Sequence, residues 1–232
     1  MTSSTIYDSL FDKVDDLVHY PWIGDKYPKA PLKLLILGDS HYTVDKNGTD
    51  DKKGHFCQEE FDKCKTDLRY TREILNVAVG TTAIWPMFKG LYDLFGITPY
   101  EAEEKFWRKI AFYNFVQTPM KQSNAKPSDD DFRKAWYCFM DVIDIIKPDI
   151  CLFIGIRGWR SNGYINLENR GKVALVYDTI KISRSTPWKA SIETINGVKT
   201  KAIAIHHTSQ GFSPIEWRNY LNHINPDIIG II

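Results

Sequence analysis

Residues 32–42 read LKLLILGDSHY, and they give the clearest indication of the architecture of this chain. Its aliphatic run stops abruptly at Gly38 and the polar residues after it, which is typical of a buried parallel strand. A second stretch of the same design, residues 202–214, reads AIAIHHTSQGFSP. Ligands of open α/β sheets bind where the carboxyl ends of such strands meet. We therefore expect a functional site where these two stretches come together.

The rest of the chain alternates between helical and strand patterns, without internal repeats. Strands are expected at 32–37, 110–115, 149–154 and 173–177, and a hairpin at 191–195 and 198–205 around Asn196-Gly197. Helices are expected at 4–19, 58–79, 86–95, from Thr98 onwards, at 128–147, and after a capping box at 213–216. The pattern predicts one α/β domain over residues 1–232. It would have three α/β/α layers and a central, mainly parallel four-stranded sheet with a β-hairpin addition.

The charge of the chain excludes a strong overall attraction to polyanions. Its 232 residues contain 30 Lys and Arg against 29 Asp and Glu. Binding to nucleic acid would then require a local basic patch. Basic residues are frequent in the second half, at Arg157, Arg160, Lys181, Arg184, Lys189, Lys199 and Lys201.

The cysteines and the apolar segments indicate the compartment. Cys57, Cys64, Cys138 and Cys151 form no C-x-x-C pair, so we expect reduced, structural thiols and neither a metal nor another cofactor. The first residues lack a basic start and a continuous apolar core, and no stretch approaches the roughly 18 apolar residues of a membrane span. These features predict a cytoplasmic protein without a membrane partner.

The order of motifs resembles the uracil-DNA glycosylase superfamily. In that superfamily a first strand ends in G-Q-D-P-Y or a related motif, and the last strand ends in H-P-S. Here the corresponding residues are Gly38-Asp39-Ser40-His41-Tyr42 and His207-Thr208-Ser209, with Asn114 on a strand between them. Ser40 stands where the best-known branch has Asp, and His41 and Thr208 stand where the superfamily has Pro. The cysteine spacings do not match the iron-sulfur branch.

The resemblance implies DNA as partner and a role for each site residue. Asp39 and His207 would be catalytic, the first stabilising the sugar cation or orienting water and the second donating to the base oxygen. Asn114 and Tyr42 would bind the extruded base. Ser40 and Ser209 would bind phosphate, Ser209 together with the following helix N-terminus. Residues 43–55, rich in Asp, Lys, Asn and Gly, predict a surface loop beside this site.

Other interpretations of the same residues stay open. Gly38-Asp39-Ser40-His41 also looks like the first block of the SGNH and GDSL hydrolases, with Ser40 as nucleophile and His207 as base. Their G-x-N-D and D-x-x-H blocks do not occur here. A catalytically silent, nucleic-acid-binding member of the glycosylase fold is a third possibility. Asp39 and Ser40 are also good caps of a turn, and Asn114 a good core amide.

Overall fold

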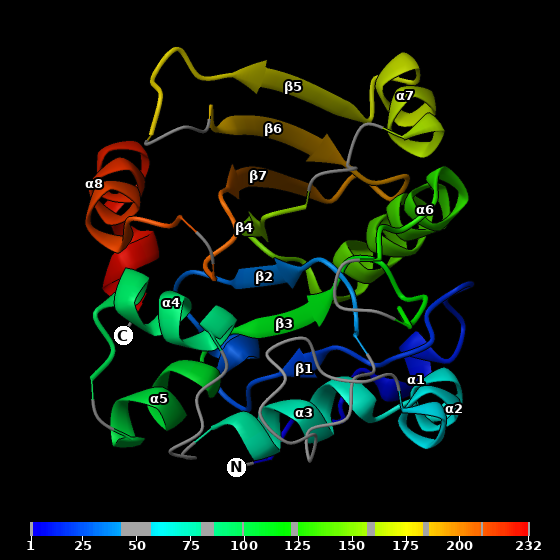
Figure 1. Ribbon diagram of the computed structural model, residues 1–232. Coiled ribbons are helices and arrows are strands. Elements are labelled where there is room, and N and C mark those ends of the chain that lie inside the picture. The colour runs from blue at the N-terminus through cyan, green and yellow to red at the C-terminus, as the bar shows by residue number, and fades with distance from the viewer. Residues whose placement is uncertain are drawn as a thin grey trace.

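The computed structural model describes residues 2–42, 57–79, 86–98, 100–121, 125–156, 161–182, 186–209 and 211–231. A seven-stranded sheet in the order β1-β3-β2-β4-β7-β6-β5 forms its centre (Figure 1). The strands are β1 Trp22–Ile23, β2 Leu34–Gly38, β3 Ala111–Asn114, β4 Ile150–Ile154, β5 Val173–Tyr177, β6 Trp188–Glu193 and β7 Lys199–Ile205.

The predicted α/β class is confirmed, but the predicted four-stranded sheet is wrong. Strands β3, β2, β4 and β7 run parallel, whereas β1, at the β3 side, and β6 and β5, beyond β7, add antiparallel pairs. The strand at 173–177 lies at the margin of the sheet and not in its core, although its sequence is apolar. The second hairpin strand, β7, takes the central place beside β4. Its first half, Lys199-Thr200-Lys201, is polar and only its second half is apolar, so its sequence resembles that of a peripheral hairpin strand.

Helices cover both faces of the sheet. One apolar core joins α1 (Asp8–Phe11), α6 (Asp129–Ile146) and α7 (Asn162–Asn169) to side chains such as Leu35 and Leu37 of β2. The other core contains Leu34 and Ile36, because successive side chains of a strand point to opposite faces. It includes residues of α3 (Tyr70–Ala78), α4 (Pro86–Phe95), α5 (Tyr100–Trp107), α8 (Pro214–Ile224) and the 3₁₀ helix η2 (Pro226–Ile231). The described chain therefore has three layers.

Helix α6 shows how the local sequence determines where a helix begins and ends. The Ser128 hydroxyl accepts a hydrogen bond from the Asp131 amide, and the Asp131 carboxylate accepts one from the Ser128 amide, which closes a capping box. At the other end Lys147 adopts a left-handed conformation with φ of 51°. The helix packs an aromatic cluster onto the sheet, in which the ring centroids of Phe115 and Trp136 are 5.2 Å apart.

Several predicted helices are corrected by the structure. The helix expected at 4–19 is a single turn, α1, since the segment instead pairs with β1 through the Ser4 amide and the Ile23 carbonyl. The helix expected at 58–79 is two helices, α2 (Gln58–Thr66) and α3, because the Asp67 carboxylate accepts from the Arg69 amide in a turn between them. Ser213 precedes α8 but makes no side-chain cap bond. Strand β1, η1 (Tyr27–Lys29) and α7 were not predicted.

Among the helices that the structure describes, none has the length and apolarity needed to cross a bilayer.

Candidate functional site

The ends of the four parallel strands bring the predicted residues to one edge of the sheet. Gly38 at the end of β2 is paired with Asn114 at the end of β3, and Ile154 at the end of β4 with Ile205 at the end of β7. Asp39 directly follows the end of β2, and His207 is the second residue after the end of β7. Strand β4 separates them, so their backbones are about 10 Å apart on ordinary strand spacing.

The side chain of Asn114 lies on Gly38. A Cβ atom at Gly38 would come within 2.2 Å of Asn114 Oδ1, so only glycine leaves room for the amide there. The backbone of Asn114 is held as well, because Gln117 Nε2 donates to its carbonyl oxygen at 2.6 Å. Gln117 Oε1 in turn accepts from the His19 amide at 2.8 Å. Asn114 is 7% exposed and is fixed at the rim of the core.

The first motif stays extended beyond the end of β2. The Val116 amide donates to the Asp39 carbonyl at 2.9 Å, and the Met120 amide donates to the His41 carbonyl at 2.7 Å. The Tyr42 hydroxyl donates to Asp39 Oδ2 at 3.3 Å. Asp39 and Tyr42 are both half-buried. The structure therefore brings this carboxylate and this phenol together, just beyond the strand end that is paired with Asn114.

Ser40 and His41 are directed into the protein. His41 Nε2 lies 2.9 Å from Thr71 Oγ1, and its ring contacts those of His19 and Tyr70. Burial, and secondly the neighbouring His19, holds the pKa of His41 well below the ordinary 6.5. This histidine is therefore a neutral packing residue. Ser40 is 7% exposed, and its Oγ has no hydrogen-bond partner among the described residues.

The last motif holds His207 in one tautomer. His207 Nδ1 accepts from the Ser209 amide at 3.2 Å and lies 2.7 Å from Ser209 Oγ. An amide N–H can only donate, so Nδ1 carries a lone pair and the neutral ring has its proton on Nε2. Ser209 is thus a positioning residue for this imidazole. In the sequence, the only indication of this contact is that Ser209 stands two residues after His207.

Glycines position the His207 loop, and sequence reasoning missed them. Gly155 directly follows β4 with φ of +66°, and a Cβ atom there would lie 2.3 Å from the Cβ of His207. Gly90 in the middle of α4 allows the Thr208 carbonyl to approach, since a Cβ at Gly90 would be 2.1 Å from that oxygen. The Thr208 hydroxyl also donates to the Met87 carbonyl at 2.7 Å. A glycine inside a helix was the available signal.

Of the basic residues that are frequent in the second half of the chain, Lys199 and Lys201 lie away from this site, and others fall outside the described residues. Lys199 and Lys201 begin β7, whereas His207 follows the other end of this strand. On strand geometry that end is about 20 Å from Lys199 and about 13 Å from Lys201. Lys189 and Lys199 pair with Asp178 at 3.0 Å and Glu193 at 3.8 Å. Residues outside the described parts are the loop at 43–55 and Arg157, Arg160 and Arg184.

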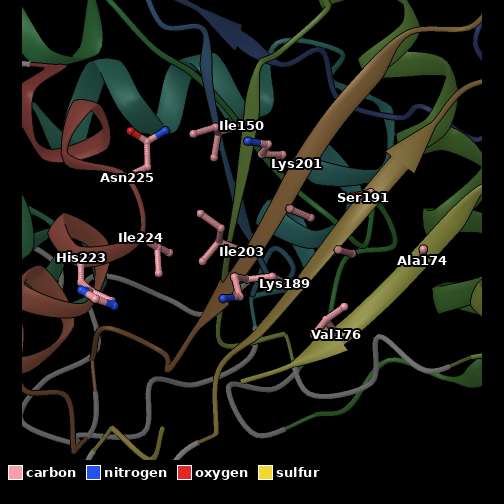
Figure 2. A pocket seen from close by; sticks show the side chains of 12 residues that line it. Ile150, Ala174, Val176, Lys189, Ser191, Lys201, Ile203, His223, Ile224 and Asn225 are labelled. Atoms are coloured by element: carbon pink, nitrogen blue, oxygen red, sulfur yellow. The ribbon is translucent and has the colours of Figure 1, made fainter. Parts of the chain in front are cut away.

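A groove of about 460 Å³ lies away from the carboxyl edge. Figure 2 shows it between the end of α8, at His223 and Asn225, and the face of β5, β6 and β7 that carries Lys189 and Lys201. Ile150, the first residue of β4, also lines it. The groove therefore belongs to the amino ends of the parallel strands and does not coincide with the predicted site.

The described residues include no group of three or more His, Cys, Asp and Glu side chains arranged to hold a metal ion. Cys64, Cys138 and Cys151 are buried and free, and Cys57 is half-buried. Burial raises the pKa of the Cys64 and Cys151 thiols to about 12, which keeps both protonated and unreactive.

No protein-family model matches the sequence, and no curated protein matches it either.

Proposed function

We propose that this protein hydrolyses the N-glycosidic bond of uracil or a damaged base in DNA, at the carboxyl edge of β3, β2, β4 and β7. One observation carries the proposal. The amide of Asn114 packs against Gly38 at the end of β2, and the side chain of His207 packs against Gly155 just after β4. Because β2 and β4 lie side by side between β3 and β7, Asn114 and His207 flank the strand ends that lead to Asp39 and Gly155.

The chemistry requires two opposite charges to be stabilised. Cleavage of the bond leaves positive charge on the sugar and negative charge on the departing base. Asp39 would stabilise the cation or orient the attacking water, with its carboxylate held by the Tyr42 hydroxyl. His207 in its Nε2–H tautomer would donate to the oxygen of the base, and Asn114 would bind the edge of the base that pairs in the duplex.

This assignment uses His207 as a neutral donor. Such a donor stabilises a developing oxyanion without first losing or gaining a proton. Ser209 supports this role because its backbone amide donates to His207 Nδ1, which leaves the proton of the neutral ring on Nε2. Ser209 is therefore proposed to act through His207, in addition to or in place of the phosphate contact that the resemblance implies.

The hydrolase alternative has less support. A serine nucleophile needs its base within hydrogen-bond reach. Among the described residues Ser40 Oγ has no such partner, and Nδ1 of His207 is occupied by Ser209. Ser40 is also nearly inaccessible, at 7% exposure.

The test is base release from labelled oligonucleotides that contain uracil or a damaged base, in single- and double-stranded form. We expect release by the wild type and a loss of about 10²-fold in His207→Ala, comparable with removal of one oxyanion donor. His223→Ala, at an exposed position of α8, is the control, because His206 Nδ1 lies 3.2 Å from the His207 carbonyl oxygen and its removal would disturb His207 itself. Circular dichroism checks that both variants are folded. Absence of release, together with ester hydrolysis that Ser40→Ala abolishes, would select the hydrolase instead.

A further inference from the structure

Two rows of side chains that cross the sheet form the floor of the groove between α8 and the strands β5, β6 and β7. The first row follows the pairing of β4, β7, β6 and β5 and consists of Ile150, Lys201, Ser191 and Ala174. The second row is two residues further along β7 and consists of Ile203, Lys189 and Val176. Side chains two residues apart on a strand share a face and lie about 7 Å apart. The groove therefore has a polar end at Lys201 and Ser191 and a more apolar end at Ile203 and Val176.

Hydrogen-bond donors from three elements border the polar end of the groove. They are the Lys201 ammonium of β7, the Ser191 hydroxyl of β6 and the side-chain amide of Asn225, which directly follows α8. Asn225 Oδ1 accepts from the Asp227 amide at 3.1 Å, so the Nδ2 group is the part of this side chain that remains for a ligand. In Figure 2 the side-chain nitrogens of Asn225 and Lys201 point towards each other, on the two sides of Ile150. The polar end is therefore lined by groups that donate.

The ionisable side chains that line the groove are all bases. They are Lys189, Lys201 and His223, and no Asp or Glu is among the described residues that line it. Lys189 is paired with Asp178 at 3.0 Å. Lys201 is exposed and has no carboxylate within 4 Å in the part of the chain that the structure describes. The Lys201 charge is therefore available to an anionic ligand.

The polar end opens into a second hollow, of about 710 Å³, which shares the three donors with the groove. Two carboxylates line this second hollow, and each has a partner of its own. Asp149 Oδ2 accepts from the Lys33 amide at 2.8 Å, and Glu193 lies 3.8 Å from the Lys199 ammonium. Lys201 is therefore not needed to compensate either carboxylate.

We propose that the groove binds a small phosphate monoester with an apolar organic group. Lys201, Ser191 and Asn225 hold the phosphate, and Ile203 and Val176 contact the organic group. Separate donors and the point charge of a lysine suit a tetrahedral phosphate, whereas a planar carboxylate is matched best by the paired N–H groups of an arginine. The volume of about 460 Å³ is in the range of pockets for small ligands.

This binding site is independent of the proposed glycosylase activity. The groove lies towards the amino ends of the parallel strands, since Ile150 is the first residue of β4 and Lys201 the third of β7. Asp39 and His207 follow the opposite ends of β2 and β7. Binding to the groove can therefore be measured without reference to base release.

Isothermal titration calorimetry with phenyl phosphate, inorganic phosphate and phenol tests the proposal. We expect phenyl phosphate to bind with Kd below about 1 mM, and more tightly than the other two, because it reaches both ends of the groove. Lys201→Met removes the charge and keeps an apolar chain, so it should weaken this binding at least about 10-fold. Lys105→Met, at an exposed position of α5 outside the groove, is the matched control. No binding of phenyl phosphate, or an equal loss in both variants, would overturn the proposal.

Val176→Ser tests the apolar end separately. Val176 is 61% exposed, so its substitution leaves the core intact. We expect the affinity for phenyl phosphate to fall about 3-fold or more, since apolar contact is lost, and that for inorganic phosphate to stay the same. Inorganic phosphate that binds the wild type as tightly as phenyl phosphate would refute recognition of an organic group.

Acetylation of lysines, followed by mass spectrometry, locates the ligand. Phenyl phosphate should protect Lys201 from the reagent and leave the reaction of Lys105 unchanged. Binding in the calorimeter without protection of Lys201 would place the ligand elsewhere and rule out this site.

Discussion

The side-chain oxygen of Asn114 occupies the place that a Cβ atom on Gly38 would need, 2.2 Å from it. The two residues are paired at the ends of β3 and β2. Gly38 therefore determines where the Asn114 amide lies, although it has no side chain of its own to offer a ligand. Position 38 is thus as important for the proposed base-binding site as Asn114 itself.

Gly38→Ala should reduce base release about as much as Asn114→Ala does. The new methyl group displaces the amide, and displacement of a binding group by about 1 Å is sufficient to cost about 10²-fold. The measurement is the single-turnover rate of each variant. Gly230→Ala is the control, because nothing lies within 4 Å of a Cβ at that glycine. Full activity of Gly38→Ala would show that Asn114 is not used.

Gly155→Ala should abolish activity through His207, whereas Gly171→Ala should not. Both glycines have positive φ, of +66° and +67°, so both substitutions strain the backbone by about 1 kcal/mol or more. Only at Gly155 does the added Cβ meet His207, at 2.3 Å. Thermal unfolding should therefore show destabilisation of both variants, larger for Gly155→Ala because of this clash, and base release should be lost only in Gly155→Ala. Equal activities would contradict a role for His207.

The free energy of unfolding should fall as pH is lowered below about 6.5. Burial is the main cause that lowers the pKa of both His19 and His41. At His19 the hydrogen bond to the Asp67 carbonyl and the charge of Asp67 raise the pKa, but burial outweighs them. In the unfolded chain both take up protons near the ordinary 6.5, whereas the folded chain resists protonation, so acid favours unfolding. The slope is at most about 1.4 kcal/mol per pH unit for each histidine.

Denaturant titrations at several pH values measure this slope. His41→Asn should flatten it whatever the variant does to absolute stability, because one titrating group is removed. His223→Gln, at an exposed position of α8, is the control. An unchanged slope in His41→Asn would show that His41 is protonated as readily in the folded as in the unfolded protein.

Arg72→Ala should destabilise the protein far more than Lys89→Ala. The Arg72 side chain is 7% exposed and donates to both carboxylate oxygens of Asp8, at 2.7 and 3.0 Å, and to the Pro21 carbonyl. Its loss leaves these acceptors without the cation and costs about 3–5 kcal/mol. Lys89 pairs with Asp93 at 2.7 Å, but their side chains are 65% and 45% exposed, so its loss costs under about 1 kcal/mol. Chemical denaturation checks both values.

Local patterns predicted the elements that depend on local physics. Helix α6 follows its capping box, and β2 and β4 follow unbroken apolar runs that are buried on both faces. The prediction of a helix at 4–19 was wrong because two of its periodic apolar residues, Ile6 and Leu10, are 62% and 43% exposed. The polar residues Ser4 and Asp8 of this segment instead bond to Ile23 and Arg72. The prediction that residues 173–177 form a core strand was also wrong, because the same apolar sequence suits a buried strand and a strand at the margin of the sheet.

The candidate site was predictable in outline and not in detail. The strand ends that carry Asp39, Asn114 and His207 meet because parallel strands share one carboxyl edge. The tautomer of His207 and the burial of His41 depend on contacts with Ser209 and Thr71, and the second contact joins residues 30 apart in sequence. The spacing of apolar residues along the sequence gives no information about such contacts.

The position of β7 has a consequence for the order in which the protein can fold. This strand lies between β4 and β6, yet it is the last of the seven to be synthesised. Until it is present, β1, β3, β2 and β4 can form one sheet and β5 with β6 a separate ribbon, without a strand to join them. Non-local pairing of this kind slows folding. Both sheet fragments would expose an unpaired edge on the ribosome, so the joining of the sheet and the completion of the His207 edge become a single late event.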